Sequence, residues 1–189
     1  MFKDMKIRKK LKLIQIIVLT AAVAFYVGSR FLSVTGKAGA VAKREMSFVE
    51  RAVDGDTLKL SDGRRVRLIG VDTPELHYSE KLLRDSQRTH KDIKTIQAFG
   101  AKAADFTRKL CERKPVRIET DVRKLDKYGR LLAYIYLEDG TFVNAKILEE
   151  GYGQVMTIPP DVKYADYFLK LEREARENRK GLWAITENM

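Results

Sequence analysis

Charged residues whose types suit phosphate chemistry lie in four short stretches of the chain. They are Asp54 to Thr57 (DGDT), Arg67, Asp72 to Glu75 (DTPE) and Asp126 to Arg130 (DKYGR). Carboxylates are ligands for hard divalent cations, and a further carboxylate can act as a general base toward water. Guanidinium groups stay charged and can donate two hydrogen bonds to one phosphate. Together, the stretches predict a site that hydrolyses phosphodiesters.

The acidic residues divide between a turn, a metal site and a base. Asp-Gly is a common turn pair, so Asp54 is expected to serve the turn and Asp56 to point into a site. Asp72 follows a neighbouring predicted strand, and together with Asp56 it forms the expected metal pair. The backbone carbonyl of Thr73 is a possible third oxygen ligand. Glu75 follows at a turn and is the candidate base.

Two arginines are the candidate phosphate ligands. Strand alternation puts Arg67 on the face opposite Val66 and Leu68, so it is expected to point outward or toward the site. Tyr128-Gly129 forms a turn that can aim Arg130 at the same place. Taken alone, Arg67 reads more readily as an ordinary surface arginine of a strand than as a site residue. Beside a metal, the pair would stabilise charge that develops in a transition state.

The segments that must position these residues alternate between strand and helix patterns. Strands are expected at residues 47–53, 57–60, 65–71, 116–120 and 131–137, and helices at 98–112, 143–150 and 162–179. Residues 76–97 are polar and are expected to form a long, mobile insertion that can hold a short helix. Because the first three strands follow one another through short turns, the pattern favours a small closed barrel over a parallel sheet.

Charge and cysteine content exclude several classes of site. The chain has 189 residues and a formal charge of +11, of which +7 falls in the first 40 residues and +4 in the rest. The remaining domain is therefore mildly basic, which permits a polyanionic substrate without requiring one. Cys111 is the only cysteine, so an intramolecular disulfide and a thiolate metal site are excluded. His77 and His90 cannot supply a three-histidine zinc site.

The N-terminus has the pattern of an export signal. A basic cluster precedes the charge-free run from Leu13 to Gly28. We expect residues 1–32 to be a signal-anchor that holds the domain outside the membrane, followed by a linker at residues 33–45. The alternative is a signal peptide that is cut after Ala40, which would release a secreted domain.

Four sequence motifs resemble those of the staphylococcal nuclease (thermonuclease) family. They are VDGDTLKL, VRLIGVDTPE, DKYGRLLAYIY and NRKGLW, and the resemblance runs from about Val49 to Trp183. It implies that residues 46–185 form an α+β domain, mainly a five-stranded OB-fold barrel with three helices. It also implies a Ca²⁺-dependent nuclease that cleaves DNA and RNA with little base specificity and leaves 3′-phosphate ends. The matched positions are Asp56, Asp72 and Thr73 for the metal, Glu75 for the base, and Arg67 and Arg130 for the phosphate.

The substrate-binding end departs from the family pattern. The family carries a tyrosine pair that stacks on the nucleotide, whereas this chain offers Thr157 and Pro159 at about those positions. Tyr164 could substitute for the pair, and Lys127 and Tyr128 are further candidate contacts. Basic residues of the insertion either contact a nucleic-acid backbone or are simply solvated; they are Lys81, Arg84, Arg88, Lys91 and Lys94.

Two other functions remain open at the sequence level. One is a non-catalytic OB-fold module that is tethered to the membrane and binds nucleic acid without cutting it. The other is a membrane-tethered structural protein that uses the insertion for protein contacts. The sequence does not indicate a preference for DNA or RNA, and no protein partner is predicted.

Overall fold

The structure is a computed structural model that describes residues 45–186. The predicted signal-anchor at residues 1–32 lies outside the described residues, as does nearly all of the predicted linker. Within the described part, no helix is both long enough and apolar enough to cross a membrane.

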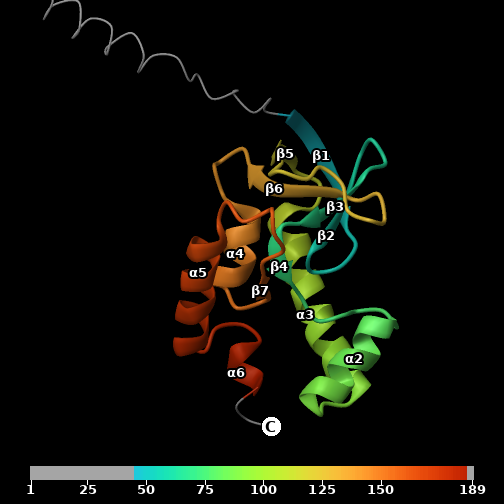
Figure 1. Cartoon of the computed structure of the whole chain (residues 1–189), viewed down its shortest axis with the longest axis vertical. Helices are drawn as coiled ribbons and strands as arrows, with labels where there is room; N and C mark the ends of the chain where they lie inside the picture. Colours follow the sequence, from blue (N-terminus) through green and yellow to red (C-terminus); the bar gives the residue numbers. More distant parts are fainter. Residues whose placement is uncertain (1–44, 187–189) are drawn as a thin grey trace, which may run out of the picture. The chain divides into compact units, whose positions relative to one another are not determined.

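The domain is built around a closed β-barrel, as predicted. Its strands are β1 (Glu45–Ala52), β2 (Thr57–Leu60), β3 (Arg65–Leu68), β5 (Pro115–Glu119) and β6 (Leu131–Leu137). They close in the order β1-β2-β3-β6-β5, and all pairs are antiparallel except β3 and β6, which are parallel. Alternate side chains of these strands fill the interior, including Val49, Leu58 and Ile135, each fully buried. Figure 1 shows the barrel at one end of the domain.

The predicted strand at residues 65–71 is interrupted before its end. Gly70 has a φ of +79°, a conformation that suits glycine, and the chain turns there out of the barrel. A Cβ atom on Gly70 would lie 2.5 Å from the ring of Phe168, so the position also lacks room for a side chain. The next residues form β4 (Gly70–Asp72), which pairs with β7 (Gln154–Met156), a strand that the sequence pattern did not predict. Asp72 therefore leaves the barrel at the end of a separate two-stranded sheet.

Helices cover the other end of the domain (Figure 1). They are α2 (Glu80–Thr89), α3 (Ile93–Cys111), α4 (Val143–Glu149), α5 (Ala165–Glu177) and the short α6 (Trp183–Thr186). The helices predicted at 98–112, 143–150 and 162–179 correspond to α3, α4 and α5. α3 starts earlier than predicted because Asp92 accepts a hydrogen bond from the backbone of Thr95 and caps it.

The segment at residues 76–97, predicted to be a long insertion that can hold a short helix, is largely helical. These residues contain α2 and the first turn of α3. Ser79 caps α2 by accepting a hydrogen bond from the backbone N–H of Leu82, and the side chain of Leu82 is fully buried. One cap and one buried leucine are enough to order a polar helix against its neighbour, and the overall polarity of the segment conceals both.

Two buried polar side chains join the helices to the barrel. Asn144 of α4 accepts a hydrogen bond from Ile135 N and donates to the carbonyls of Ile69 and Ala133. It therefore links α4 to β6 and to the bend between β3 and β4. Thr107 of α3 donates from its hydroxyl to the carbonyl of Gly55 at 2.8 Å. This second link fixes the turn that carries Asp56.

Candidate active site

The turn between β1 and β2 places Asp56 in the interior. The carboxylate of Asp54 accepts a hydrogen bond from Asp56 N at 3.0 Å, which is the turn role predicted for it. Gly55 lies close against Thr73, because a Cβ at Gly55 would be 2.7 Å from the Thr73 side chain. The absence of a side chain at Gly55 thus lets the two segments approach.

Both carboxylate oxygens of Asp56 are engaged. Oδ1 lies 2.6 Å from Nη1 of Arg67, and Oδ2 accepts hydrogen bonds from Thr73 N at 2.9 Å and Thr73 Oγ1 at 3.0 Å. Burial alone would raise the pKa of Asp56, but Arg67 and the N–H of Thr73 outweigh burial and lower it. Asp56 is therefore ionised. Burial, followed by the charge of Asp56, raises the pKa of Asp54 to about 7.

Arg67 joins the two predicted metal carboxylates. Besides Asp56, it contacts Asp72 through Nη2 at 3.0 Å. Its guanidinium points toward the site, one of the two directions that strand alternation allowed, and the whole residue is only 9% exposed. A cation this well buried beside two carboxylates neutralises them where water is scarce.

Lys81 of α2 completes the charged cluster. Its Nζ lies 2.9 Å from Asp72 Oδ1 and 3.0 Å from Glu75 Oε1, and it donates a hydrogen bond to the carbonyl of Thr73 at 3.0 Å. Burial opposes its charge, but Asp72 and Glu75 outweigh burial and raise its pKa. Sequence reasoning had placed Lys81 only among the basic residues of the insertion. Nothing in its neighbours along the chain indicates this contact, because it depends on the position of α2.

The donors around Lys81 suit a hard cation. Among the described residues, no cluster of three or more His, Cys, Asp or Glu side chains could hold a metal ion. However, Asp72, Thr73 and Glu75 already direct three oxygens at one positive charge, that of Lys81. Carboxylate and carbonyl oxygens are the ligands that Ca²⁺ takes. The residues therefore fit a Ca²⁺ site in donor chemistry, with Asp56 adding a buried negative charge beside it.

Arg130 is held by the loop that precedes β6. Oδ1 of Asp126 accepts hydrogen bonds from the backbone N–H groups of Tyr128 and Arg130, both at 2.9 Å. Oδ2 of the same carboxylate lies 2.7 Å from Nε of Arg130. The guanidinium is thus oriented through Nε, and Asp126 fixes both the loop and the arginine. This agrees with the predicted aiming of Arg130 by the turn.

A cavity of about 130 Å³ brings the two arginines together. We name it the arginine cavity; its walls include Arg67, Arg130, Leu132, Met156 and Ile158. The sequence comparison had assigned Thr157 and Pro159 to the positions of the missing tyrosine pair. In the structure, the residues of this segment that line the cavity are Met156 and Ile158. The apolar part of the wall is therefore aliphatic rather than aromatic, and the wall also includes Arg123, which pairs with Asp161.

The predicted substrate contacts Lys127, Tyr128 and Tyr164 differ in their exposure to solvent. Tyr128 is 71% exposed, and Lys127 Nζ lies 4.9 Å from the centre of its ring. Tyr164 instead packs edge-on against Tyr134, with ring centroids 4.7 Å apart, and its hydroxyl donates to Glu119. The ring of Tyr164 is thus part of an internal aromatic cluster, whereas Tyr128 is available at the surface.

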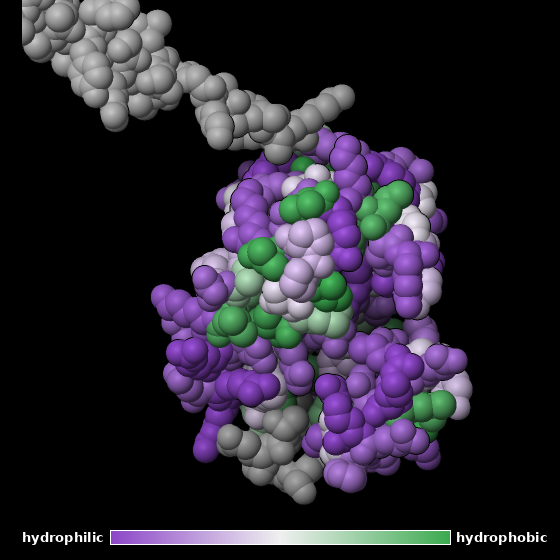
Figure 2. Space-filling model, in the orientation of Figure 1, coloured by the Kyte–Doolittle hydropathy of each residue, from purple (hydrophilic) through white to green (hydrophobic). Residues whose placement is uncertain are grey.

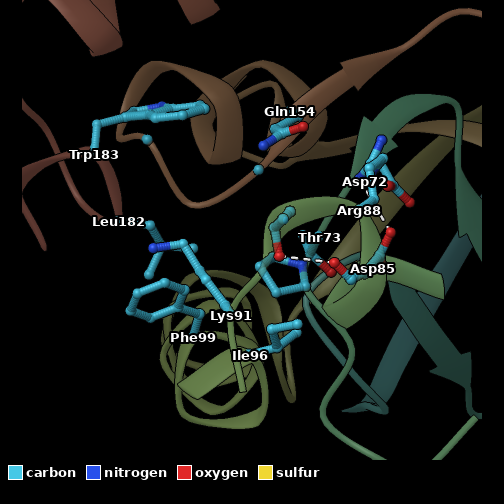
Figure 3. Close-up of a pocket in the computed structure, with 14 residues that line it drawn as sticks. Asp72, Thr73, Asp85, Arg88, Lys91, Ile96, Phe99, Gln154, Leu182 and Trp183 are labelled. Atoms are coloured by element: carbon cyan, nitrogen blue, oxygen red, sulfur yellow. Dashed lines mark hydrogen bonds and ion pairs between the residues drawn. The ribbon is translucent and has the colours of Figure 1, made fainter. Parts of the chain in front are cut away.

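A second concavity begins at the carboxylate cluster and runs between helices. This helical groove has a volume of about 110 Å³ and is lined by Asp72, Thr73, Pro74, Asp85, Arg88, Thr89, Lys91, Ile96, Phe99, Gly151, Gly153, Gln154, Leu182 and Trp183. Figure 3 shows Trp183 and Gln154 across the groove from Phe99 and Ile96. Its floor is mainly apolar; Lys91 and Arg88 lie beside it, and Arg88 pairs with Asp85 at 3.0 Å. Figure 2 shows that hydrophilic side chains dominate the visible face of the domain, with a smaller apolar area near its middle.

The fold and the charged cluster define an OB-fold domain with an acidic centre flanked by arginines. Comparison with known families agrees with this class. The family model described as staphylococcal nuclease homologue matches residues 65–185. The chain belongs to this family.

Individual relatives share much of their length with the chain. A thermonuclease from Staphylococcus intermedius is 37% identical over 150 residues, which cover 78% of this chain and 81% of the relative. A thermonuclease from Staphylococcus hyicus is 32% identical and is covered to 95%. Endonuclease YncB from Bacillus subtilis is 35% identical over 141 residues, which cover 72% of this chain and 60% of YncB.

Proposed function

We propose that this protein is a Ca²⁺-dependent endonuclease that hydrolyses the phosphodiester bonds of DNA and RNA and leaves 3′-phosphate ends. The observation that carries the proposal is the position of Arg67. Its guanidinium contacts Asp56 and Asp72 and also forms part of the wall of the arginine cavity with Arg130. A phosphate at this wall would meet two guanidinium groups beside the acidic centre.

The residues divide the chemistry among them. Asp56, Asp72 and the carbonyl of Thr73 would hold Ca²⁺, with Glu75 beside it, and a bound Ca²⁺ would supply positive charge that stabilises the charge developing on the phosphate. Glu75 takes a proton from the attacking water, the bond from phosphorus to the 5′-oxygen breaks, and the leaving oxygen takes a proton from solvent water. Arg67 and Arg130 donate hydrogen bonds to the phosphate oxygens and stabilise the charge that grows on them. These roles agree with the endonuclease names of the relatives.

The wall of the arginine cavity supports low base specificity. Leu132, Met156 and Ile158 offer aliphatic surface to a base and no hydrogen-bond donors or acceptors from their side chains. Discrimination between bases needs hydrogen bonds to base edges, whereas phosphate contacts only position the strand. We expect all four bases to be accepted.

The N-terminal pattern supports export as part of the same proposal. The basic cluster and apolar run at residues 1–32 would keep the domain on the outer side of a membrane, unless cleavage near Ala40 releases it. Mass spectrometry of the mature N-terminus distinguishes tethering from secretion. A start near Val41 would establish cleavage, and an intact first residue would establish the anchor.

A chelator-controlled cleavage assay tests the proposed activity. The whole chain is incubated with single-stranded DNA in Ca²⁺ and, in parallel, with a Ca²⁺ chelator, and the product ends are analysed for 3′-phosphate. We expect cleavage only with Ca²⁺, and a loss of at least a hundredfold in Glu75→Gln and Arg67→Ala. Wild-type protein that binds DNA in a salt-sensitive manner without producing fragments would instead establish the non-catalytic binding module.

A further inference from the structure

Lys81 occupies the point at which the candidate metal ligands converge. It is the second residue of α2, and its ammonium makes three contacts of 2.9 to 3.0 Å, with Asp72 Oδ1, Glu75 Oε1 and the carbonyl of Thr73. An ammonium has three N–H donors, so these three oxygens satisfy all of them. The side chain is 28% exposed and reaches inward from the edge of the site.

The same oxygens cannot serve Lys81 and a metal ion at once. Ca²⁺ requires ligand oxygens at about 2.3–2.6 Å and takes six to eight of them. An ammonium nitrogen with three oxygens within 3.0 Å fills that space. Its charge also reduces the attraction of the site for a second cation, because three carboxylates (Asp56, Asp72 and Glu75) face two positive side chains (Arg67 and Lys81).

We propose that Lys81 is a built-in competitor for the divalent cation, one that neutralises the acidic centre in the metal-free protein and has to withdraw before Ca²⁺ binds. This inference rests on the proposed function for the identity of the metal. It adds that the affinity for Ca²⁺ is set by Lys81 as well as by the ligands. It also adds that metal binding loosens the first turn of α2, because Lys81 ties that turn to Asp72, Thr73 and Glu75 at the end of β4.

A purely structural role for Lys81 makes the opposite prediction. If the ammonium only clamps α2 onto the barrel, its removal would loosen Glu75 and leave Ca²⁺ affinity unchanged or lower. Leu82 is fully buried next to Lys81 and Ser79 caps the helix, so α2 keeps two other attachments when Lys81 is replaced. The two roles are therefore separable by measurement of metal affinity alone.

Calorimetric titration of Ca²⁺ into the whole chain, without nucleic acid, tests the inference. The variants are Lys81→Met and Lys81→Gln, and the matched control is Arg84→Met, which removes one positive charge from an exposed position of the same helix. We expect both Lys81 variants to bind Ca²⁺ at least tenfold more tightly than wild type, and the control to change affinity by less than threefold. Equal or weaker binding by a folded Lys81 variant would overturn the inference.

Hydrogen exchange provides a second readout that does not depend on activity. In wild type, saturating Ca²⁺ is expected to speed amide exchange at Leu82 and Leu83, whose N–H groups bond to Ser79, several-fold because the Lys81 contacts are lost. In Lys81→Met, exchange there is expected to be fast already and insensitive to Ca²⁺. Protection of these amides by Ca²⁺ in wild type would contradict the inference.

The failure of the inference and that of the proposed function remain distinguishable. If neither wild type nor Lys81→Met binds Ca²⁺, the inference is overturned, and the chelator assay still decides whether the protein cleaves DNA. If Lys81→Met binds Ca²⁺ more tightly but no variant cleaves DNA, the inference stands and the nuclease proposal falls.

Discussion

Arg67 and Arg130 have similar predicted roles but very different surroundings. The Arg67 side chain is 11% exposed and neutralises two carboxylates, whereas the Arg130 side chain is 26% exposed and pairs with Asp126 in a surface loop. Removal of one partner from a buried ion pair leaves an uncompensated charge, which costs about 3–5 kcal/mol. A more exposed pair contributes about 1 kcal/mol or less.

Substitution of the two arginines is therefore expected to separate stability from catalysis. Arg67→Ala should lower the free energy of unfolding by about 3 kcal/mol, and Arg130→Ala by about 1 kcal/mol or less. Both should lower cleavage by at least a hundredfold, since each removes a phosphate ligand. Urea unfolding followed by the fluorescence of Trp183, together with the cleavage assay, measures both quantities. Equal destabilisation by the two substitutions would contradict this account.

At the scale of single residues, the motifs predicted most of the acidic centre. Asp56, Arg67, Asp72 and Thr73 are joined by direct contacts, while Glu75 reaches the cluster through Lys81. Short spacing and strand alternation suffice for these, because the residues lie on adjacent strand ends. Lys81 could not be assigned in the same way, since its contact depends on a helix whose packing the sequence does not reveal.

At the scale of elements, α3 determines how the Glu75 segment lies. Gly100 of α3 faces that segment, and a Cβ there would be 2.5 Å from the carbonyl oxygen of Glu75. Both groups are backbone, so a side chain cannot be accommodated by a simple rotation. Glycine is therefore required at this position in the middle of the helix, because any side chain would collide with the Glu75 segment.

Gly100→Ala is expected to destabilise the protein, whereas the same substitution in most helices stabilises it. Alanine at an unobstructed helical site would stabilise the protein by about 1 kcal/mol. Here it should destabilise the protein and lower cleavage at least tenfold, because it displaces the backbone that carries Glu75. Ala101→Gly, at the exposed next position, is the control and should cost only about 1 kcal/mol with unchanged cleavage. A stabilised, fully active Gly100→Ala variant would refute the packing argument.

The helical groove offers a path for a nucleic-acid backbone away from the acidic centre. Arg88 and Lys91 lie on it, and one end of the groove is formed by Asp72 and Thr73 (Figure 3). A long strand that is cleaved at the centre can reach these cations, whereas a dinucleotide is too short to do so. Each phosphate contact that is lost lowers the salt dependence of binding.

Replacement of both groove cations is expected to affect long substrates selectively. Arg88→Ala/Lys91→Ala should raise the KM for a 20-nucleotide strand severalfold. The binding of this strand should also depend less on salt, by the amount that about two phosphate contacts contribute. Cleavage of a dinucleotide should not change. The control is Arg108→Ala/Lys109→Ala, which removes the same charge from exposed positions on α3. Equal effects of the two double variants would assign the result to net charge rather than to the groove.

Element prediction was strongest where apolar periodicity is regular. β2 and β6 have the predicted bounds, and α3, α4 and α5 differ from prediction mainly at their ends. α2 is the short helix that the insertion was expected to be able to hold, but its bounds could not be predicted because it buries only one leucine and depends on its cap. β7 was missed because its three residues gain strand structure only by pairing with β4, a contact between distant parts of the chain.

At the scale of the whole molecule, Cys111 offers a natural probe of unfolding. It is the only cysteine, it is fully buried at the end of α3, and burial raises the pKa of its thiol to about 12. Only the thiolate reacts with alkylating reagents. The native protein should therefore resist alkylation even at pH 9, where a thiol in an unfolded chain, with a pKa of about 8.5, is largely ionised.

Alkylation of Cys111 is expected to follow global unfolding. The labelling rate of the native protein should rise with urea in parallel with the unfolded fraction, and mass spectrometry with iodoacetamide measures it. If the native protein, without urea, were labelled at pH 9 as fast as the unfolded chain, the end of α3 that carries Cys111 would have to open locally.

The parallel pairing of β3 with β6 brings the two candidate phosphate ligands together. Arg67 lies on β3 opposite Leu132, and Arg130 directly precedes β6, so this pairing alone brings the two guanidinium groups to one cavity. It joins segments far apart in the sequence, and such contacts form late because a long intervening loop must first be closed. The two arginines of the proposed phosphate site therefore meet only in a chain whose barrel has closed, so cleavage activity is expected to return no earlier than barrel closure during refolding.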